Sequence, residues 1–329
     1  MASRCFIAGL GAHLPRRIVT NADMERLVDT SDEWIRTRTG IGRRHFSGPD
    51  EPCSVLAHQA SLRALDDAGL TPADLTHVMV GTFSGDYNLP TTACLLQDML
   101  GLKGLPAFDL AAACSGFLYG LETARAYCSL YPDARILVVG SEVVTSRINF
   151  EDRSTCVLFG DGAGAAVVTG QDHPTGIRVL DVMLKADGSV GELLTVHGGG
   201  SACAPVLGQT IGEEYFVRMN GRDVFKHAVR YMSDVSAALL ERNGLGAADV
   251  DLVIPHQANI RIIEAVVRKL DVDMDRVYVN VDRVGNTSAA SIPIALTEAA
   301  SSGRIRSGMK VLLTAFGGGF TWAAALLQF

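Results

Sequence analysis

The chain repeats a pattern of its own sequence at one fixed spacing. Residues 70–82 read LTPADLTHVMVGT, and residues 245–257 read LGAADVDLVIPHQ. Each runs from a leucine through a short loop and Ala-Asp into an apolar strand. At the same spacing, ARILVVGS at 134–141 lies over MKVLLTAF at 309–316. Because internal repeats mark repeated structural units, we predict two similar halves, residues 1–172 and 173–329.

Strand and helix patterns alternate within the first half. Strands are predicted at 4–12, 76–82, 107–112, 134–141 and 163–170. Helices are predicted at 54–70, 91–102 and 115–130, where apolar residues recur at helical spacing. The strands are almost continuously apolar, which is typical of a sheet buried on both faces. Two such halves predict an α/β fold with five layers, α-β-α-β-α.

The composition argues against several classes of protein. The 329 residues carry a formal net charge of −7, which disfavours non-specific nucleic-acid binding. No apolar run is long enough for a membrane span. The N-terminal run is too short for a signal peptide and ends at Pro15, so we expect a cytoplasmic protein. The seven cysteines are an odd number without a CxxC pair, which argues against a disulfide framework and a zinc site.

Cys114 is the strongest candidate for a nucleophile. It lies between the strand that ends near Leu110 and the helix that begins near Ser115. A helix N-terminus carries unpaired N–H groups and partial positive charge, which favour a thiolate. The small residues around it, 111–113 and Gly116, are expected to leave room for a substrate.

Two polar residues of the second half are expected to meet Cys114. His256 follows the strand DLVI, and Asn286 lies in the turn NVDRVGNTSAAS, which we align with the Cys114 turn. Side chains at strand ends commonly carry the chemistry of α/β proteins. A cysteine beside a histidine suits covalent acyl transfer. Taken singly, His256 also fits a structural histidine, and Asn286 also fits a helix cap.

The glycine-rich stretch FGDGAGAAV at 159–167 suggests a nucleotide-binding loop at first sight. Its spacing is GxGxG, and a β-branched strand follows it in place of a helix. No helix N-terminus would therefore receive a pyrophosphate. We interpret these glycines as positions of close backbone packing.

Six motifs resemble those of the β-ketoacyl-acyl-carrier-protein synthase III family, which has the thiolase fold. They are TSDEWIRTRTGI (30–41), AFDLAAACSGF (107–117), FGDGAGAAV (159–167), PHQANIRII (255–263), GNTSAASIP (285–293) and AFGGGFTW (315–322). The resemblance covers nearly the whole chain. It implies a homodimeric acyltransferase that uses a coenzyme A thioester as substrate, with no permanently bound cofactor and no metal.

The resemblance also implies a reaction and its residues. Cys114 would take an acyl group from coenzyme A, and malonyl-acyl-carrier protein would then lose CO2 and attack the acyl-cysteine. His256 and Asn286 would donate hydrogen bonds to the malonyl thioester oxygen. The N–H groups of Cys114 and Gly318 would form the oxyanion hole for the acyl-cysteine carbonyl.

Binding residues follow from the same resemblance. Coenzyme A would contact Thr30, Trp34, Arg38, Arg153 and Asn259, with the adenine between Trp34 and Arg153. The acidic carrier protein would dock on Arg222, Lys226 and Arg261. Arg222 and Lys226 are four residues apart and share one face of a predicted helix; a solvated helix face is the alternative interpretation.

The chain departs from the family pattern around the acyl pocket. We assign this pocket to Ser84, Leu89, Val144, Arg147 and Phe316, and Phe83 stands where the family commonly has threonine. Leu89 stands where the family often has a bulky gate supplied by the partner subunit. In ordinary members of the family we expect a small neutral residue at the position of Arg147. An arginine in an acyl tunnel is costly unless it meets an anion, such as a carboxylate on the acyl chain.

We therefore favour glutaryl-CoA as donor, giving 3-oxopimeloyl-acyl-carrier protein, as in the biotin-pathway branch of the family. Arg147 could instead point outward or pair with Glu142 or Glu151. The alternative functions are the acetyl-CoA-using initiation enzyme of type II fatty acid synthesis and a polyketide starter enzyme or acyltransferase on the same fold. A papain-like hydrolase and a non-catalytic coenzyme A-binding protein are more distant alternatives.

Overall fold

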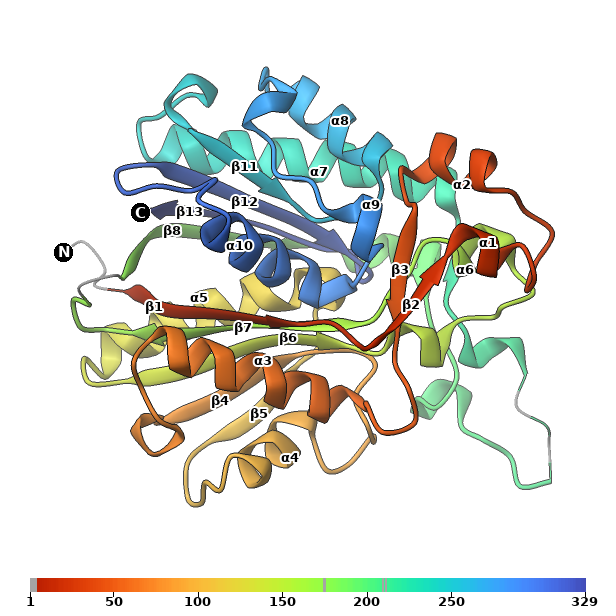
Figure 1. The fold of residues 1–329 in the computed structure, drawn as a ribbon, viewed down its shortest axis with the longest axis horizontal. Coiled ribbons are helices and arrows are strands. Elements are labelled where there is room, and N and C mark those ends of the chain that lie inside the picture. Colours follow the sequence, from red (N-terminus) through yellow and green to blue (C-terminus); the bar gives the residue numbers. More distant parts are fainter. Residues whose placement is uncertain (1–4, 174–175, 209, 211) are drawn as a thin grey trace.

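The computed structural model describes residues 5–173, 176–208, 210 and 212–329. Nine strands form one mixed sheet with the order β11-β12-β13-β8-β1-β7-β6-β4-β5 (Figure 1). Their bounds are β1 Phe6–His13, β4 His77–Gly81, β5 Ala107–Leu110, β6 Arg135–Glu142, β7 Gly162–Thr169, β8 Ile177–Ala186, β11 Leu252–Pro255, β12 Lys310–Gly317 and β13 Thr321–Gln328.

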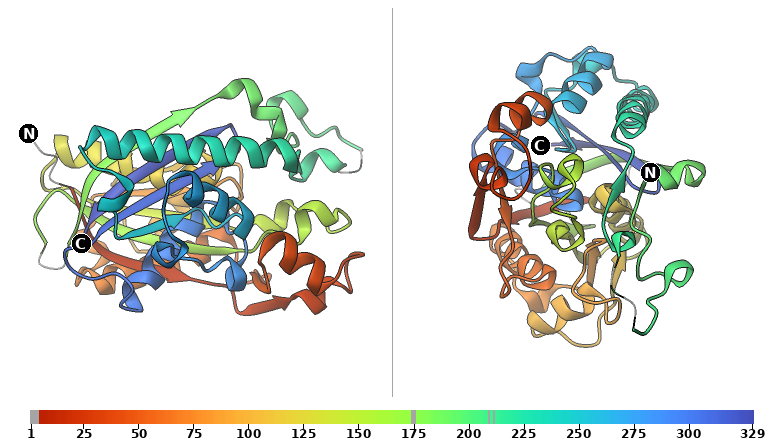
Figure 2. Two further views of the ribbon diagram at one scale, coloured as in Figure 1. Left: turned by 90° about the horizontal axis from the view of Figure 1, so that it is seen from above. Right: turned by 90° about the vertical axis from the view of Figure 1, so that its right-hand side faces the viewer.

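The nine strands form two layers, because the only pairing between the two parts of the sheet, among the described residues, is the short one between β1 and β8. It joins Phe6 to Arg178 and Ile7 to Ile177, and the strands then diverge. Helices α5 (Gly116–Leu130) and α10 (Ser291–Ser301) lie between the two layers. Helices α3 (Cys53–Asp67) and α4 (Thr92–Met99) cover one outer face, and α7 (Gly221–Arg242) and α8 (Ile260–Lys269) cover the other (Figures 1 and 2). The predicted α-β-α-β-α fold is confirmed.

Equivalent strands of the two halves are separated by the spacing of the sequence repeat. β4 begins at His77 and β11 at Leu252, while β6 and β12 span 135–142 and 310–317. The counterpart of β5 is reduced to a single parallel bridge between Val253 and Val277. The predicted strands and helices of the first half match the observed ones to within a few residues, although the predicted first strand included Arg4, which lies outside the described residues. The predicted boundary at 172/173 falls between β7 and β8.

The glycines of FGDGAG allow β7 to lie against α10. A Cβ atom at Gly164 would be 2.7 Å from Pro293 Cβ and 2.8 Å from Ile294 N. A contact below 3.0 Å with backbone atoms leaves no space for a side chain. Close packing therefore accounts for this motif, as expected from its sequence.

Short elements gather at one end of the layers. The β2–β3 hairpin (Arg17–Thr20 and Arg43–Phe46), α1 (Asn21–Met24) and α2 (Asp32–Thr39) lie there, with α6 (Arg153–Cys156) nearby (Figure 1). Helix α9 (Val281–Val284) and the β9–β10 pair (Leu194–Thr195 and Arg218–Met219) complete the described elements of this region. In the described part of the chain, no helix is long and apolar enough to cross a membrane.

Candidate active site

Cys114 lies in a 3-10 turn, Ala113–Ser115, between β5 and α5. The turn begins with Ala113 at φ 44°, a left-handed conformation that is uncommon for residues other than glycine. The end of β12 presses against it, because a Cβ atom at Gly317 would be 2.5 Å from Cys114 N. The turn position predicted from the sequence is therefore correct. Gly116, however, makes room for β4, since a Cβ atom at Gly81 would be 2.7 Å from its carbonyl carbon.

The second half contains the same turn at Ser288–Ala290, before α10. Ser288 also has a left-handed φ, 49°, and it stands at the position of the repeat that is equivalent to Ala113. The counterpart of Cys114 is consequently Ala289, and the predicted alignment of Asn286 with Cys114 is wrong. Asn286 lies just before the turn, on its approach from α9.

His256 follows β11 and is buried. Its Nδ1 lies 2.5 Å from Ser291 Oγ, which also accepts a hydrogen bond from the Gln257 N–H at 3.3 Å. In the described part of the chain Nε2 has no hydrogen-bond partner. Burial lowers the pKa of His256 to about 3, so the ring is neutral at physiological pH. A serine hydroxyl can donate to Nδ1 or accept from it, and so supports either ring tautomer.

Asn286 is held with its amide group oriented. Its Oδ1 accepts a hydrogen bond from the Ser288 N–H at 2.9 Å. The backbone is fixed as well, because Asn286 N donates to Leu158 O at 2.9 Å and Gly160 N donates to Asn286 O at 3.0 Å. With Oδ1 engaged, Nδ2 remains as the group that can donate to a ligand.

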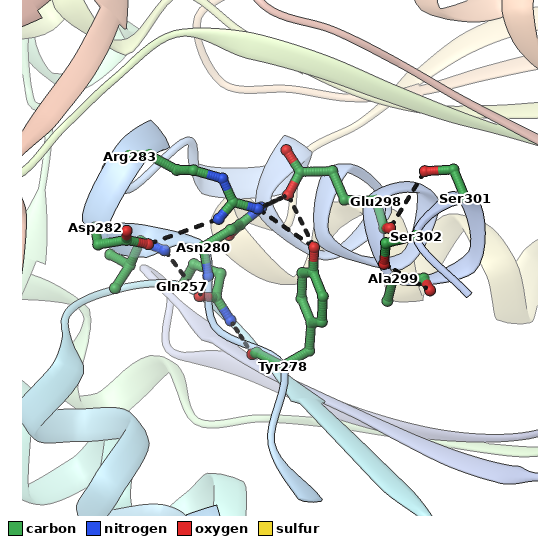
Figure 3. A network of polar contacts seen from close by, with 10 residues as sticks. Gln257, Tyr278, Asn280, Asp282, Arg283, Glu298, Ala299, Ser301 and Ser302 are labelled. Carbon is green, nitrogen blue, oxygen red and sulfur yellow. Dashed lines mark hydrogen bonds and ion pairs between the residues drawn. The ribbon is translucent and has the colours of Figure 1, made fainter. Parts of the chain in front are cut away.

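A polar network begins at Gln257, the residue that follows His256 in the sequence (Figure 3). The amide of Gln257 donates to Pro255 O at 2.7 Å and accepts from Asn280 N at 2.9 Å. Asn280 Nδ2 in turn donates to Glu298 at 2.9 Å, and the Arg283 guanidinium donates to the same carboxylate at 2.5 Å. The end of β11 is thereby tied to the segment that leads into α9 and Asn286.

Two cavities meet at Cys114. The first has a volume of about 650 Å³ and is lined by Cys114, His256 and Asn286 together. The second, of about 460 Å³, is lined by Cys114 and by Gly318, whose N–H donates no hydrogen bond in the described part of the chain. The structure thus brings the three predicted polar groups to one cavity wall and gives the thiol access to a second chamber.

The thiol of Cys114 is buried at the junction of these cavities. Burial raises the pKa of Cys114 to about 12, the neighbouring Ser288 hydroxyl lowers this pKa, and the nearby Glu142 raises it. The expected stabilisation of a thiolate by the helix N-terminus is outweighed, so the resting residue is a neutral thiol. All seven cysteines are free. No group of three or more His, Cys, Asp or Glu suited to a metal ion occurs among the described residues.

Comparisons with known proteins show the family of the chain. The model of 3-oxoacyl-[acyl-carrier-protein (ACP)] synthase III matches residues 108–188, and that of its C-terminal region matches residues 240–329. The beta-ketoacyl-[acyl-carrier-protein] synthase III of Nitratidesulfovibrio vulgaris is 56% identical over 331 aligned positions, covering 100% of both chains. This chain belongs to the synthase III family. It is therefore an acyltransferase of the condensing type.

Solved structures place the chain in the same family. The crystal structure of 3-oxoacyl-[acyl-carrier-protein] synthase III from Aquifex aeolicus has a TM-score of 0.90 and 44% identity, covering 99% of this chain and 100% of that one. The priming β-ketosynthase of the R1128 polyketide pathway has a TM-score of 0.87 and 35% identity, covering 98% and 96%. The predicted fold of a synthase III is thus confirmed in detail.

The predicted coenzyme A residues of this synthase III divide into two groups. Arg38 and Asn259 line the first cavity, but Thr30, Trp34 and Arg153 do not. The guanidinium carbons of Arg38 and Arg153 lie 5.1 and 4.7 Å from the Trp34 ring centroid. Arg153 therefore rests directly on Trp34, and an adenine ring could enter between Trp34 and Arg153, as predicted, only after Arg153 moves. The hydroxyl of Thr30 is buried and has no partner in the described part of the chain.

The predicted acyl-pocket residues are also divided. Arg147 lines the second cavity with Phe83, whereas Phe316 lines the first. Ser84 is misassigned, because its hydroxyl donates to Glu142 and accepts from Val143 N at 2.9 Å. Val144 also differs from its assignment, because it is fully buried in the core and lines neither of the two cavities. Leu89 is 85% exposed and lines neither cavity of its own chain, so its role as a gate supplied by a partner subunit stays a prediction.

Arg147 forms no hydrogen bond or ion pair through its guanidinium within the described residues. Pairing with Glu142, one of the alternatives considered from the sequence, does not occur. The carboxylate of Glu142 is engaged by hydroxyl and backbone donors instead.

The predicted docking residues surround the mouth of the first cavity. Arg222, Lys226 and Arg261 are exposed and line it. Lys226 pairs with Asp223 at 2.9 Å, so part of its charge is compensated. Residues that the sequence interpretation missed are Glu142, Ser288 and Ser291. The polar Ser-Glu end of the apolar strand ILVVGSE was the available signal for Glu142.

Proposed function

We propose that this synthase III transfers an acyl group from an acyl-CoA to Cys114 and condenses it with malonyl-acyl-carrier protein. The observation that carries the proposal is the meeting of two cavities at Cys114, one of them shared with His256 and Asn286. The products are β-ketoacyl-acyl-carrier protein, coenzyme A and CO2. Coenzyme A thioesters are substrates in this family, and no permanently bound cofactor is involved.

His256 and Asn286 stabilise the charge that decarboxylation places on the malonyl thioester oxygen. A neutral imidazole donates through Nε2 when Ser291 donates to Nδ1, and Asn286 donates through Nδ2. Donors fixed before the reaction contribute most because they need no reorganisation. The Gly318 N–H, together with that of Cys114, serves the acyl-cysteine carbonyl from the second cavity.

The favoured acyl donor is glutaryl-CoA. Arg147 lines the second cavity and has no acidic partner within the described residues, so its charge is available to a ligand carboxylate. Such charge-assisted pairs are strong and directional. Condensation of the five-carbon donor with a two-carbon unit gives 3-oxopimeloyl-acyl-carrier protein, a precursor for biotin.

The test compares kcat/KM for glutaryl-CoA and acetyl-CoA in the wild type and in Arg147→Ala. We expect the variant to lose about 30-fold with glutaryl-CoA, as for a hydrogen bond to a charged group, and less than threefold with acetyl-CoA. Arg218→Ala is the matched control, because Arg218 pairs with Glu213 and does not line the cavity. An equal loss on both substrates would contradict the glutaryl assignment.

The second candidate donor is acetyl-CoA, as in initiation of fatty acid synthesis. It is favoured by the 56% identity to a beta-ketoacyl-[acyl-carrier-protein] synthase III over the whole chain. The 35% identity to a priming β-ketosynthase keeps a polyketide starter role in third place. The same kinetic comparison separates the two donors, because acetyl-CoA would be the better substrate of the wild type in an initiation enzyme.

Binding partners complete the proposal. Coenzyme A enters past Arg38 and Asn259, with Thr30, Trp34 and Arg153 beyond them, and the acidic carrier protein docks on Arg222, Lys226 and Arg261. A cytoplasmic homodimer without nucleic-acid or membrane partners fits this role. The free edge of β5 and the exposed Leu89 favour a dimer that extends the sheet and contributes Leu89 to the partner's site.

A further inference from the structure

A buried carboxyl group lies close to the nucleophile but has no part in the proposed reaction. Glu142 ends β6 and is fully buried. Its Oε2 accepts hydrogen bonds from Thr82 Oγ1 at 3.1 Å, from Phe83 N and Ser84 N at 3.2 Å each, and from the Ser84 hydroxyl. In the part of the chain that the structure describes, no cation lies within ion-pair distance. Buried carboxylates without a cation are unusual.

Ser288 connects this carboxyl group to Cys114. Its hydroxyl donates to Glu142 Oε1 at 2.9 Å. The turn that carries Ser288 packs against the Cys114 turn, and the Ser288 hydroxyl lowers the pKa of the thiol beside it. The left-handed backbone at Ser288 and its N–H bond to Asn286 hold it in this place. The three groups follow one another, with Cys114 beside Ser288 and Ser288 Oγ bonded to Glu142 Oε1, and all three residues are buried.

The path answers a need of the first half-reaction. The thiol of Cys114 must lose its proton before it attacks a thioester. The buried, neutral His256 has a pKa of about 3 and is a weak proton acceptor. Glu142 is the other acceptor within reach, and burial raises its pKa to about 7 against the hydrogen bonds that lower it. Both of its protonation states are therefore accessible near neutrality.

We propose that Glu142 is a positioning residue that takes up the proton of Cys114 through Ser288. The S–H bond breaks with its electron pair left on sulfur, and that proton binds Ser288 Oγ. The original Ser288 proton passes to Glu142 Oε1, so a thiolate and a neutral carboxyl group replace a thiol and a carboxylate. This inference rests on the proposed role of Cys114 as acyl acceptor and adds the fate of its proton.

Few other titratable groups face Glu142. The thiol of Cys53, from α3, hydrogen-bonds Ser141 beside it, and the pKa of Cys53 lies above its ordinary range because of burial first and Glu142 second. Cys114 faces it from the turn before α5. The segment after β4 contributes Thr82, Phe83 and Ser84, and β7 pairs Gly162 with it, none of which is charged. Glu142 raises the pKa of the Cys114 thiol, so the charge of the carboxyl group affects the titration of the nucleophile.

The test is the pH profile of Cys114 alkylation by iodoacetamide in the full chain, with the modified peptide quantified by mass spectrometry. In the wild type a proton shared within the pair makes the rate nearly independent of pH for about one unit above pH 7. Glu142→Gln and Ser288→Ala remove the acceptor and the link. Their rates should rise about tenfold per pH unit, as for an isolated thiol, and Ser288→Ala should react about tenfold more slowly at pH 7.

Thr82→Val is the matched control, because it removes a donor to Oε2 and leaves the Ser288 link intact. It should keep the flat region and move its onset to higher pH, since the carboxylate loses a stabilising hydrogen bond. If Glu142→Gln does not fold, Ser288→Ala and Thr82→Val still decide the matter.

A tenfold rise per pH unit in the wild type, or a flat region that survives in Ser288→Ala, would overturn the proposal. Either result leaves the role of Cys114 untouched. That role fails separately if the Cys114→Ala variant retains condensation of acyl-CoA with malonyl-acyl-carrier protein.

Discussion

The two halves use one pair of equivalent positions for opposite purposes. In the first half, Gly81 and Gly116 pack a strand end directly on a helix start, with no space for side chains. In the second half the equivalent positions, one repeat further along the chain, hold His256 and Ser291, joined by a 2.5 Å hydrogen bond. The same backbone arrangement thus serves packing in one half and a catalytic side chain in the other.

A second pair of equivalent positions, Glu142 and Gly317, lies where each half contacts the turn of the other half. Glu142 of the first half reaches the Ser288 turn, and its counterpart Gly317 in the second half lies against the Cys114 turn. A glycine on one side leaves the nucleophile room, while a carboxyl group on the other side supports it. The backbone is alike in the two halves at these positions, whereas the side chains differ.

The largest expected effect comes from moving the thiol between the halves. Cys114→Ala should lower condensation activity at least about a thousandfold, because covalent catalysis is lost. Adding Ala289→Cys at the equivalent position should restore nothing, since Ala289 is fully buried and lines neither cavity. Product formation from acyl-CoA and malonyl-acyl-carrier protein measures both. Cys94→Ser, at an exposed cysteine, is the control, and recovery in the double variant would break the comparison.

The buried carboxyl group should make stability depend on pH. The pKa of Glu142 rises from 4.5 unfolded to about 7 folded, so the folded state holds the proton more tightly. Its contribution is complete below pH 4.5 and is lost as the pH rises through 7, amounting to about 3 kcal/mol. Urea unfolding of wild type and Glu142→Gln at pH 5 and pH 8 measures it. The free energy of unfolding of the wild type, relative to that of Glu142→Gln, should be lower at pH 8 than at pH 5 by that amount. The same relative free energy at both pH values would contradict the assignment.

Adding a methyl group to the packing pair should destabilise the fold. A Cβ atom at Gly81 would be 2.7 Å from backbone carbon of Gly116, which cannot yield easily. Gly81→Ala should lower the free energy of unfolding by about 2 kcal/mol through overpacking. Denaturant titration followed by circular dichroism measures the loss. Gly188→Ala, where no atom lies within 4 Å, is the control and should change stability little.

The smallest effect is expected from removing the Ser291 hydroxyl, which hydrogen-bonds His256. Ser291→Ala leaves His256 without its Nδ1 partner, and malonyl decarboxylation should fall about tenfold, or about 1.4 kcal/mol. Acylation of Cys114 should change less. Release of CO2 from malonyl-acyl-carrier protein and acylation by intact mass separate the two steps. Ser301→Ala, on the same helix but at an exposed position, serves as control, and a loss confined to acylation would refute the role given to Ser291.

Much of the fold could be predicted because its causes are local. Apolar strands and helical periodicity gave the elements of the first half, and the repeat gave the layered order. The counterpart of Cys114 was misjudged for a physical reason. The polar residue nearest in sequence, Asn286, was aligned with it, whereas the left-handed residues Ala113 and Ser288 mark the true register.

The site was predicted where strand ends converge and missed where side chains compete for partners. Sequence cannot tell that the Ser84 hydroxyl is taken by Glu142, because residues 58 positions apart meet only in the fold. Burial likewise decides the protonation of Cys114 against the helix N-terminus. The proximity of Arg147 to the second cavity could be anticipated only from the family resemblance.

The meeting of two chambers at one sulfur has a consequence for engineering. Their walls share only Cys114, Phe159 and Leu194 among the described residues. Under the proposed assignment, in which the second chamber holds the acyl group, starter-unit preference and bond formation can be changed separately. Grafting the wall of the second chamber from a relative is the smallest exchange that should transfer a new starter unit while the carrier still meets the same His256 and Asn286.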